Sequence, residues 1–214
     1  MKIALIGATG FVGKAVLNEA LHRGHKVTAI ARNTDKLGPE NENLVVKQAD
    51  AYNSDELAAV LTGNDAVVSA FNPGWDNPNI YEDFIRGAKS IQEATKKAGI
   101  DRLLVVGGAG SLEIKPGVQL VDTPEFPAEW KNGAMAAREY LNIIKQENGL
   151  DWTFLSPAII LHQGERTNKF RLGTDHPIFD DNGKSEITVE DLAVAIIDEL
   201  IKGRFIKKRF TVGY

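Results

Sequence analysis

Short apolar runs alternate along the chain with longer stretches in which apolar residues recur every three or four positions. That alternation is typical of parallel strands connected by helices, because strands covered on both faces have no polar side. The expected strands are Lys2 to Ile6, Lys26 to Ala31, Leu44 to Gln48, Ala66 to Ala70, Arg102 to Val106 and Trp152 to Ser156. The pattern predicts one doubly wound α/β domain over residues 1–214.

Apolar stripes at helical spacing predict the intervening helices. The stripes are Val12, Val16 and Ala20, then Ile80, Phe84, Ala88 and Ile91, then Ala134, Ala137, Leu141 and Ile144. Asn53 and Thr188 each stand three residues before an acidic residue, which is typical of a capped helix start. Gly99 and Gly149 are expected to end helices.

Three segments rich in proline and glycine, residues 71–78, 107–127 and 157–177, follow predicted strands. Open α/β sheets bind ligands in the loops beyond the carboxyl ends of their strands. We therefore expect active-site loops, with a small substrate cap built from residues 111–130 and 160–188.

Composition narrows the partners. The formal net charge of −4 provides no basic field for nucleic acid. Every apolar run, including the N-terminal one, is far shorter than the roughly 20 residues of a membrane span, and no signal peptide is recognised. The chain has no cysteine, so a disulfide framework is excluded and a cytoplasmic location is expected. The expected partner is a small molecule.

A glycine motif opens the first predicted helix. Gly7, Gly10 and Gly13 directly follow the first strand at the spacing of a dinucleotide-binding turn. There, glycines allow a tight turn, close approach of the backbone to a diphosphate and close packing of helix on sheet, while the helix N-terminus attracts the phosphates. This motif indicates a Rossmann-type domain that binds a nicotinamide dinucleotide.

Arg32 occupies the end of the second strand, where an acidic residue usually accepts the ribose hydroxyl of NAD. A guanidinium can bind a 2′-phosphate in a bidentate manner, and Lys36 adds charge, so NADP is favoured and NAD remains possible. The alternative is a solvated surface arginine, with Asp35 as the ribose acceptor.

These features, together with Gln48-Ala49-Asp50, Val105-Val106-Gly107-Gly108-Ala109 and Leu155-Ser156-Pro157, make the whole chain resemble the atypical short-chain dehydrogenase/reductases. Within them, it is most similar to the NmrA-like NAD(P)H-binding group, which includes flavin reductases. The resemblance implies three sets of cofactor contacts. Gly7, Thr9, Gly10, Phe11 and Val12 would line the diphosphate. Arg32, Asp50 and Ala51 would surround the adenosine, and Ala70, Phe71, Asn72, Gly107, Gly108, Pro157, Ala158 and Ile159 would border the ribose and nicotinamide. Asp50 is equally explained as a polar strand end, and Asn72 as part of a turn.

The Tyr-x-x-x-Lys pair of the superfamily is missing. Tyr140 is followed at that spacing by Ile144, while Lys145 points about 100 degrees away on a helix. Tyr140 lies in an apolar stripe, so we expect it to pack rather than to exchange protons. Hydride transfer to a flavin tolerates this absence, because the accompanying proton can come from water.

The candidate catalytic residue is Ser111, the best hydrogen-bond donor near the reacting centre by resemblance to a serine often found there; a capping hydroxyl is the alternative. Aromatic side chains that could wall the acceptor, or merely anchor loops, are Phe71, Trp75, Phe126 and Trp130. The four histidines show no ligand spacing that predicts a metal site; capping by His22 and His25 and surface roles for His162 and His176 are expected.

The sequence thus predicts an NAD(P)H-dependent oxidoreductase that passes hydride to a flavin-like or quinone-like acceptor. Two alternatives remain. One is a non-enzymatic NADP(H)-sensing regulator with a protein partner, as in NmrA-like proteins, and the other is an epimerase or dehydratase relative, which needs a proton-transfer residue that the sequence does not reveal.

Overall fold

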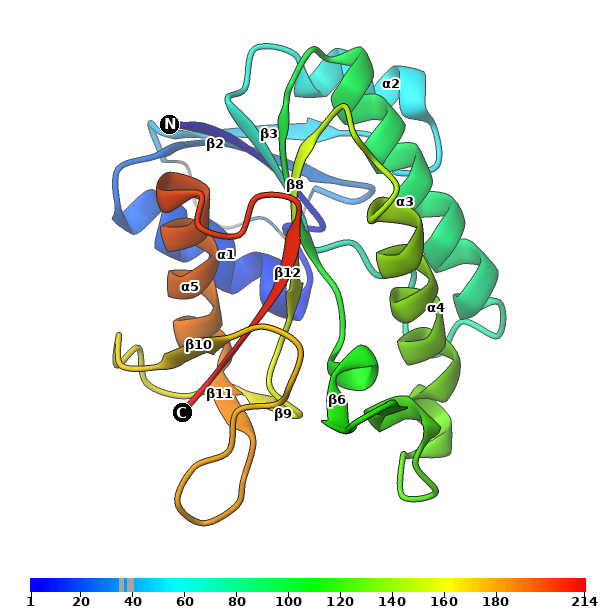
Figure 1. The fold of residues 1–214 in the computed structure, drawn as a ribbon. Helices are drawn as coiled ribbons and strands as arrows, with labels where there is room; N and C mark the ends of the chain where they lie inside the picture. The colour runs from blue at the N-terminus through cyan, green and yellow to red at the C-terminus, as the bar shows by residue number, and fades with distance from the viewer. Residues whose placement is uncertain (35–36, 38–40) are drawn as a thin grey trace.

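The computed structural model describes residues 1–34, 37 and 41–214. Its main sheet is mixed only at one edge (Figure 1). In spatial order, its strands are β10 (Arg171–Gly173), β12 (Lys208–Gly213), β8 (Asp151–Ser156), β5 (Arg102–Val106), β4 (Ala66–Ser69), β1 (Lys2–Ile6), β2 (Lys26–Ala31) and β3 (Leu44–Gln48). All neighbours pair in parallel except β10 and β12, which are antiparallel. The predicted doubly wound Rossmann-type sheet is confirmed.

Helices cover both faces of the sheet (Figure 1). One apolar layer joins the sheet to α1 (Phe11–His22) and α5 (Val189–Lys202). The other joins it to α2 (Ser54–Leu61), α3 (Ile80–Lys97) and α4 (Ala128–Ile144). The predicted apolar stripes are buried in these layers, except that Val12 is half-buried. A parallel sheet buried on both faces explains why its strands were recognisable as continuous apolar runs.

The predicted helix starts are confirmed by cap geometry. Asn53 Oδ1 accepts a hydrogen bond from the backbone N–H of Glu56 at 3.2 Å, and Thr188 Oγ1 accepts one from Asp191 at 3.2 Å. Gly99 has a positive φ of 70° just after α3. Gly149 does not end a helix, because α4 already ends at Ile144.

The predicted strand list differs from the structure in several places, including the start of β8, which is Asp151 rather than Trp152. The fourth strand ends at Ser69 rather than at Ala70, because Ala70 already turns toward the loop after β4. The seventh parallel strand, β12, was not predicted at all. Lys208 and Arg209 form its first two positions, and charged side chains are the strongest local signal against a buried strand.

Small elements surround the carboxyl ends of the strands, at the bottom of Figure 1. After β5 come η1 (Ala109–Ser111), the hairpin of β6 (Glu113–Lys115) and β7 (Val118–Gln119), and η2 (Leu120–Asp122). After β8, β9 (Ile160–His162) pairs with β11 (Glu186–Thr188). The N–H of Glu113 donates to the carbonyl of Asp175 at 2.8 Å, so the two segments expected to form the cap touch each other.

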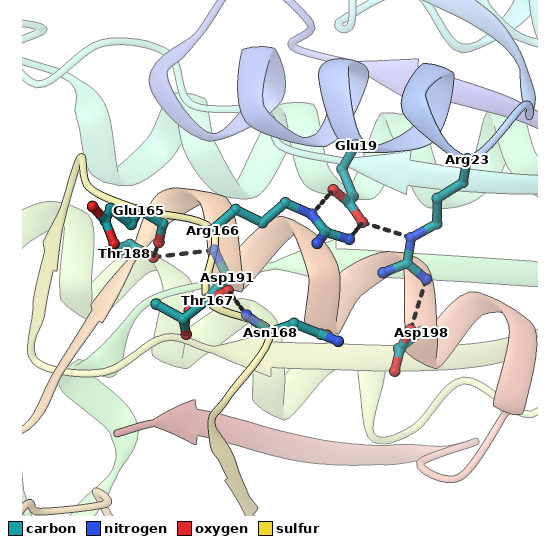
Figure 2. A network of polar contacts seen from close by, with 9 residues as sticks. All are labelled: Glu19, Arg23, Glu165, Arg166, Thr167, Asn168, Thr188, Asp191 and Asp198. Carbon is teal, nitrogen blue, oxygen red and sulfur yellow. Dashed lines mark hydrogen bonds and ion pairs between the residues drawn. The ribbon is translucent and has the colours of Figure 1, made fainter.

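Residues 163–170, which we call the strap, run across the outer side of α1 and α5 (Figure 2). Arg166 of the strap binds Glu19 of α1 with Nε and Nη2, at 2.7 and 2.8 Å. Arg23 joins the same Glu19 to Asp198 of α5. Burial alone would raise the pKa of Glu19, but hydrogen bonds from Arg166 and Arg23 outweigh burial and hold this pKa below its ordinary value.

A second anchor of the strap is the fully buried carboxyl group of Asp191 in α5. Its oxygens accept hydrogen bonds from Thr167 Oγ1 at 2.5 Å and from the N–H of Asn168 at 2.8 Å. The hydroxyl of Tyr214 donates to the same carboxyl at 2.8 Å. One buried side chain thus holds the strap and Tyr214 on α5.

No helix in the described part of the chain is long and apolar enough to cross a bilayer.

Candidate functional site

The turn between β1 and α1 forms an open anion cradle. Gly10 occupies the N-cap position of α1, no side chain caps the helix, and its first turn contains no acidic residue. Thr9 is half-buried, and Gly10 and Phe11 are exposed, so the helix end is accessible. Free N–H groups and the positive end of a helix dipole attract phosphates. This geometry fits the diphosphate of a dinucleotide.

Close backbone approaches explain two of the three glycines. Gly7 has a φ of 80°, and a Cβ atom there would lie 2.5 Å from the carbonyl oxygen of Ala70. A Cβ atom at Gly13 would lie 2.0 Å from the carbonyl oxygen of Gly7. Side chains at these positions would therefore displace the turn that presents the N–H groups.

The ends of β2 and β3 hold the residues for which the sequence predicts adenosine contacts, and those contacts remain predictions. Exposed Arg32 follows β2, and its carbonyl accepts a hydrogen bond from Gln48 Nε2 at 3.0 Å. Exposed Asp50 follows β3 and receives the N–H of Tyr52 at 3.0 Å, while Ala51 is buried. The order β1-β2-β3 brings Arg32 and Asp50 to the same edge as the cradle. Lys36 and Asp35 lie outside the described residues.

Sequence reasoning missed two residues on this side. Arg86 of α3 stacks over the ring of Tyr52, with 4.2 Å between its guanidinium carbon and the ring centroid. Burial and the charge of Asp83 raise the pKa of the Tyr52 phenol, although Arg86 and Arg32 both oppose that shift. A second cation therefore stands near Arg32. In the sequence, the only hint of this arrangement was an aromatic residue, Tyr52, directly after the predicted adenosine contacts Asp50 and Ala51.

The ring of Phe71 packs toward the interior of the protein. Its ring packs edge-to-face on Tyr52 at 5.8 Å and against Phe84 at 6.3 Å, and a Cβ atom at Gly87 would lie 2.4 Å from it. The ring therefore points toward α3, and only the backbone of Phe71 remains beside the cradle. This packing favours the alternative that Phe71 anchors its loop over a role in stacking on an acceptor.

The remaining predicted cofactor contacts lie at the ends of β4, β5 and β8. Half-buried Ala70 bonds to Ile6, and exposed Asn72 accepts the N–H of Gly74 at 2.7 Å, as its turn interpretation predicts. Gly107 and Gly108 follow β5, where a Cβ atom at Gly107 would lie 2.0 Å from the ring of Phe154. Pro157 and Ala158 are buried after β8, whereas Ile159 is exposed. Their contacts with a nicotinamide remain predictions.

Tyr140 packs in the core, as the sequence predicts. It is 1% exposed, and its hydroxyl donates to Gln92 Oε1 at 3.2 Å. Burial, with a smaller contribution from the charge of Glu147, raises the pKa of the phenol far above its ordinary value. Ile144 is also fully buried. A proton-exchanging Tyr/Lys pair is therefore not formed by this helix.

Ser111 lies in η1 and is 2% exposed. Arg209 of β12 donates from Nη1 to the carbonyl of Ser111 at 2.8 Å and to its hydroxyl oxygen at 3.1 Å. The same guanidinium pairs with Asp175. Sequence reasoning missed Arg209, because nothing in the sequence indicates that residues 98 positions apart touch each other.

Four exposed apolar side chains lie in segments that follow β4, β5 and β8, and Trp130 lies in the first turn of α4. Trp75, Trp130, Ile159 and Phe179 are between 38% and 56% exposed. Trp75 packs on α4, since a Cβ atom at Gly133 would lie 2.7 Å from its ring; Phe126 is half-buried. Large exposed apolar side chains near strand ends are candidates for contacts with a ligand.

Among the described residues, no group of three or more His, Asp or Glu side chains is placed so that it could hold a metal ion. His162 and His176 instead hydrogen-bond through Nδ1 to the carbonyls of Gln163 and Glu113.

The NAD(P)H-binding family model matches residues 7–201 of the chain. The uncharacterised protein YwnB of Bacillus subtilis (strain 168) is 38% identical over 99% of this chain and 98% of its own length. A solved Bacteroides thetaiotaomicron protein, named as a candidate epimerase, is 50% identical with a TM-score of 0.94, covering 100% of this chain and 96% of that one. A Streptococcus pneumoniae structure, named as a candidate NADH-flavin reductase, is 36% identical with a TM-score of 0.83, covering 100% and 99%.

Proposed function

The chain belongs to the NAD(P)H-binding family, and from this premise we propose that it is an NADPH-dependent reductase of flavin-like or quinone-like acceptors. The cofactor class follows from the family and from the cradle at α1. The resemblance to the atypical short-chain dehydrogenase/reductases is confirmed by the fold and the family match. The acceptor class and the preference for NADPH are our proposals.

One observation carries the choice of acceptor, namely the burial of Tyr140 against Gln92. Reduction of a carbonyl by a short-chain dehydrogenase requires a phenol that exchanges a proton, and the proton of this phenol is already donated to Gln92 within the core between α3 and α4. Flavins and quinones accept hydride at electron-poor ring positions, and water can then supply the proton. Trp75, Trp130 and Phe179 are exposed apolar side chains in segments that follow β4, β5 and β8, and we propose that they supply apolar surface for a planar ring.

The residues of the chain act mainly by positioning. A dihydronicotinamide held at this site would supply hydride to the acceptor, and water would supply the proton that completes the reduction. The cradle would hold the diphosphate through N–H groups of α1, and Arg32 would hold the 2′-phosphate. Exposed apolar side chains exclude water from the acceptor. Well-oriented reactants need little further chemistry from the protein.

Turnover tests the proposal directly. Purified protein is mixed with NADPH and, in separate reactions, FMN, riboflavin and a soluble quinone, and loss of dihydronicotinamide absorbance is followed. We expect oxidation of NADPH that depends on both protein and acceptor, and faster turnover with NADPH than with NADH. Binding of NADPH without turnover on any of these acceptors would contradict the proposal.

Arg32→Ala should weaken NADPH binding about 30-fold while changing NADH affinity less than threefold. The reason is that the guanidinium contributes about 2 kcal/mol by bonding the 2′-phosphate, a group that NADH lacks. Titration calorimetry with both nucleotides measures the two dissociation constants. Arg204→Ala is the matched control, because this exposed arginine follows α5 far from the cradle. Equal losses for both nucleotides would remove Arg32 from the 2′-phosphate site.

The similarity to a candidate epimerase is the observation that favours a second function. An epimerase or dehydratase needs a proton-transfer group beside the nicotinamide, and Tyr140 does not supply it. Release of a tritium label from nucleotide sugars during incubation with the protein and NAD would support that function over the reductase. The regulator alternative instead expects equal affinity for NADP⁺ and NADPH together with absent turnover.

A further inference from the structure

Arg209 is a buried cation that the proposed reaction does not yet use. Its side chain is 5% exposed, and its register partner on β8 is Phe154. The ring of Phe154 lies directly beneath Gly107, so the guanidinium lies on the same sheet face as the loop expected to border the nicotinamide. Burying an arginine is costly, and a buried ion pair often stabilises a protein no more than apolar side chains of similar size would. The burial of Arg209 therefore calls for an explanation other than stability.

The contact of Arg209 with the hydroxyl group of Ser111 suggests why this arginine is buried. In both hydrogen bonds between the two residues, Arg209 is the donor and an oxygen of Ser111 is the acceptor, so neither bond engages the hydroxyl proton of Ser111. Among the described residues no acceptor is found for the hydroxyl proton, although Ser111 is 2% exposed. A buried donor left unpaired is unfavourable. The repulsion between two donors also directs this proton away from the guanidinium.

A cation that donates to a hydroxyl oxygen makes that hydroxyl a stronger donor, because chains of hydrogen bonds polarise one another. Asp175 fixes the opposite side of the guanidinium through Nε and Nη2, so the fork cannot rotate away from Ser111. The backbone of the same loop bonds to Glu113 just after η1. The arrangement is held from both sides.

We infer that Arg209 is a positioning residue that orients and polarises Ser111, so that its hydroxyl donates a hydrogen bond to the acceptor atom that gains negative charge on reduction. This inference rests on the proposed function and adds to it. The proton that completes the reaction still comes from water, and Ser111 keeps its own. The pairing favours acceptors with a carbonyl oxygen or ring nitrogen beside the position that receives hydride, as in flavins and quinones.

The test is a double-mutant cycle on the full-length protein with Ser111→Ala, Arg209→Met and the double variant. We expect kcat for FMN reduction to fall about 100-fold for Ser111→Ala and about 30-fold for Arg209→Met. The double variant should lose no more than Ser111→Ala alone, because Arg209 acts through the serine. Arg209→Lys keeps the positive charge but lacks the planar guanidinium, so it should retain more of kcat than Arg209→Met. It also provides a folded variant if Arg209→Met is unstable.

A second readout does not depend on turnover. The dissociation constant of FMN is measured by tryptophan fluorescence on protein loaded with NADP⁺, where no hydride is available. Each single variant should weaken FMN about fivefold, the size of one lost hydrogen bond, and the double variant should weaken it no further. NADP⁺ affinity, measured in the same samples, should change less than twofold.

Arg102→Met is the matched control, because Arg102 is also a largely buried arginine but bonds Glu199 and the carbonyl of Asp151 at the opposite end of β5. It should lower the melting temperature and leave kcat and FMN affinity unchanged. Wild-type values of kcat and FMN affinity in Arg209→Met, multiplied losses in the double variant, or an equal loss of kcat in Arg102→Met would overturn the role of Arg209. Failure of the wild-type protein to oxidise NADPH with FMN or quinones would instead overturn the proposed function itself.

Discussion

Replacing Gly13 by alanine is expected to weaken NADPH binding about 1,000-fold, which corresponds to about 4 kcal/mol. The added Cβ atom would lie 2.0 Å from the carbonyl oxygen of Gly7 and 2.9 Å from the Cα atom of Ala8. Both neighbours are backbone atoms, so no side chain can rotate away. Either α1 or the turn must move, and the N–H groups then leave the positions at which they meet the diphosphate. Titration calorimetry with NADPH measures the loss.

The control for Gly13→Ala is Asn18→Ala, an exposed change later in α1. It should leave NADPH affinity within twofold of the wild type. Circular dichroism must show Gly13→Ala to be folded, since alanine favours a helix interior by about 1 kcal/mol over glycine and partly offsets the clash. A folded Gly13→Ala protein that binds NADPH within threefold of the wild type would contradict the placement of the diphosphate on this turn.

The strands were predictable because burial on both faces leaves a continuous apolar run. Val67 and Val68 of β4, and Leu103 to Val105 of β5, are such runs, and both are nearly inaccessible. The same logic failed for β12, where Lys208 and Arg209 open the strand and leave only Phe210 to Val212 as a short, interrupted apolar run. A charge in a central strand contradicts the local rule, and such departures are expected where a site needs them.

The cradle could be predicted because its chemistry lies in the main chain. Gly7 and Gly13 are needed where the backbone approaches itself, so their spacing in the sequence is sufficient. Side-chain directions are a different matter. Phe71 and Arg86 lie 15 positions apart, and only the packing of β4 on α3 decides that Phe71 points inward and that Arg86 covers Tyr52. Local pattern carries no information about such contacts.

The strap illustrates the same limit at longer range. Glu19 and Arg166 are 147 positions apart and meet only because α1 and α5 pack side by side on one sheet face (Figure 2). The sequence places residues 163–170 in a substrate cap, whereas Arg166, Thr167 and Asn168 bind α1 and α5. These contacts fix the chain between β9 and β10 and leave the segment around Asp175 to face η1.

Asp191→Ala is expected to destabilise the protein by about 3 kcal/mol, because it leaves buried donors without their acceptor. The hydroxyls of Thr167 and Tyr214 and the N–H of Asn168 all bond to this carboxyl group, which is fully buried. For a protein of this size, that loss lowers the melting temperature by about 10 °C. Calorimetry or circular dichroism measures the shift.

Local release of the strap should accompany this destabilisation. Limited trypsin digestion at 25 °C should cut Asp191→Ala after Arg166 or Lys169 well before the wild type, because released segments are the first to be cleaved. Asp191→Asn is the matched variant: it keeps one carbonyl oxygen as acceptor and should lose about half as much stability. Asp198 lies on the same helix as Asp191, and its half-buried carboxylate binds Arg23 of the α1 end and Lys202 of α5. Asp198→Ala should change the melting temperature by less than about 4 °C. Equal melting temperatures for Asp191→Ala and the wild type would show that the strap does not depend on this carboxyl group.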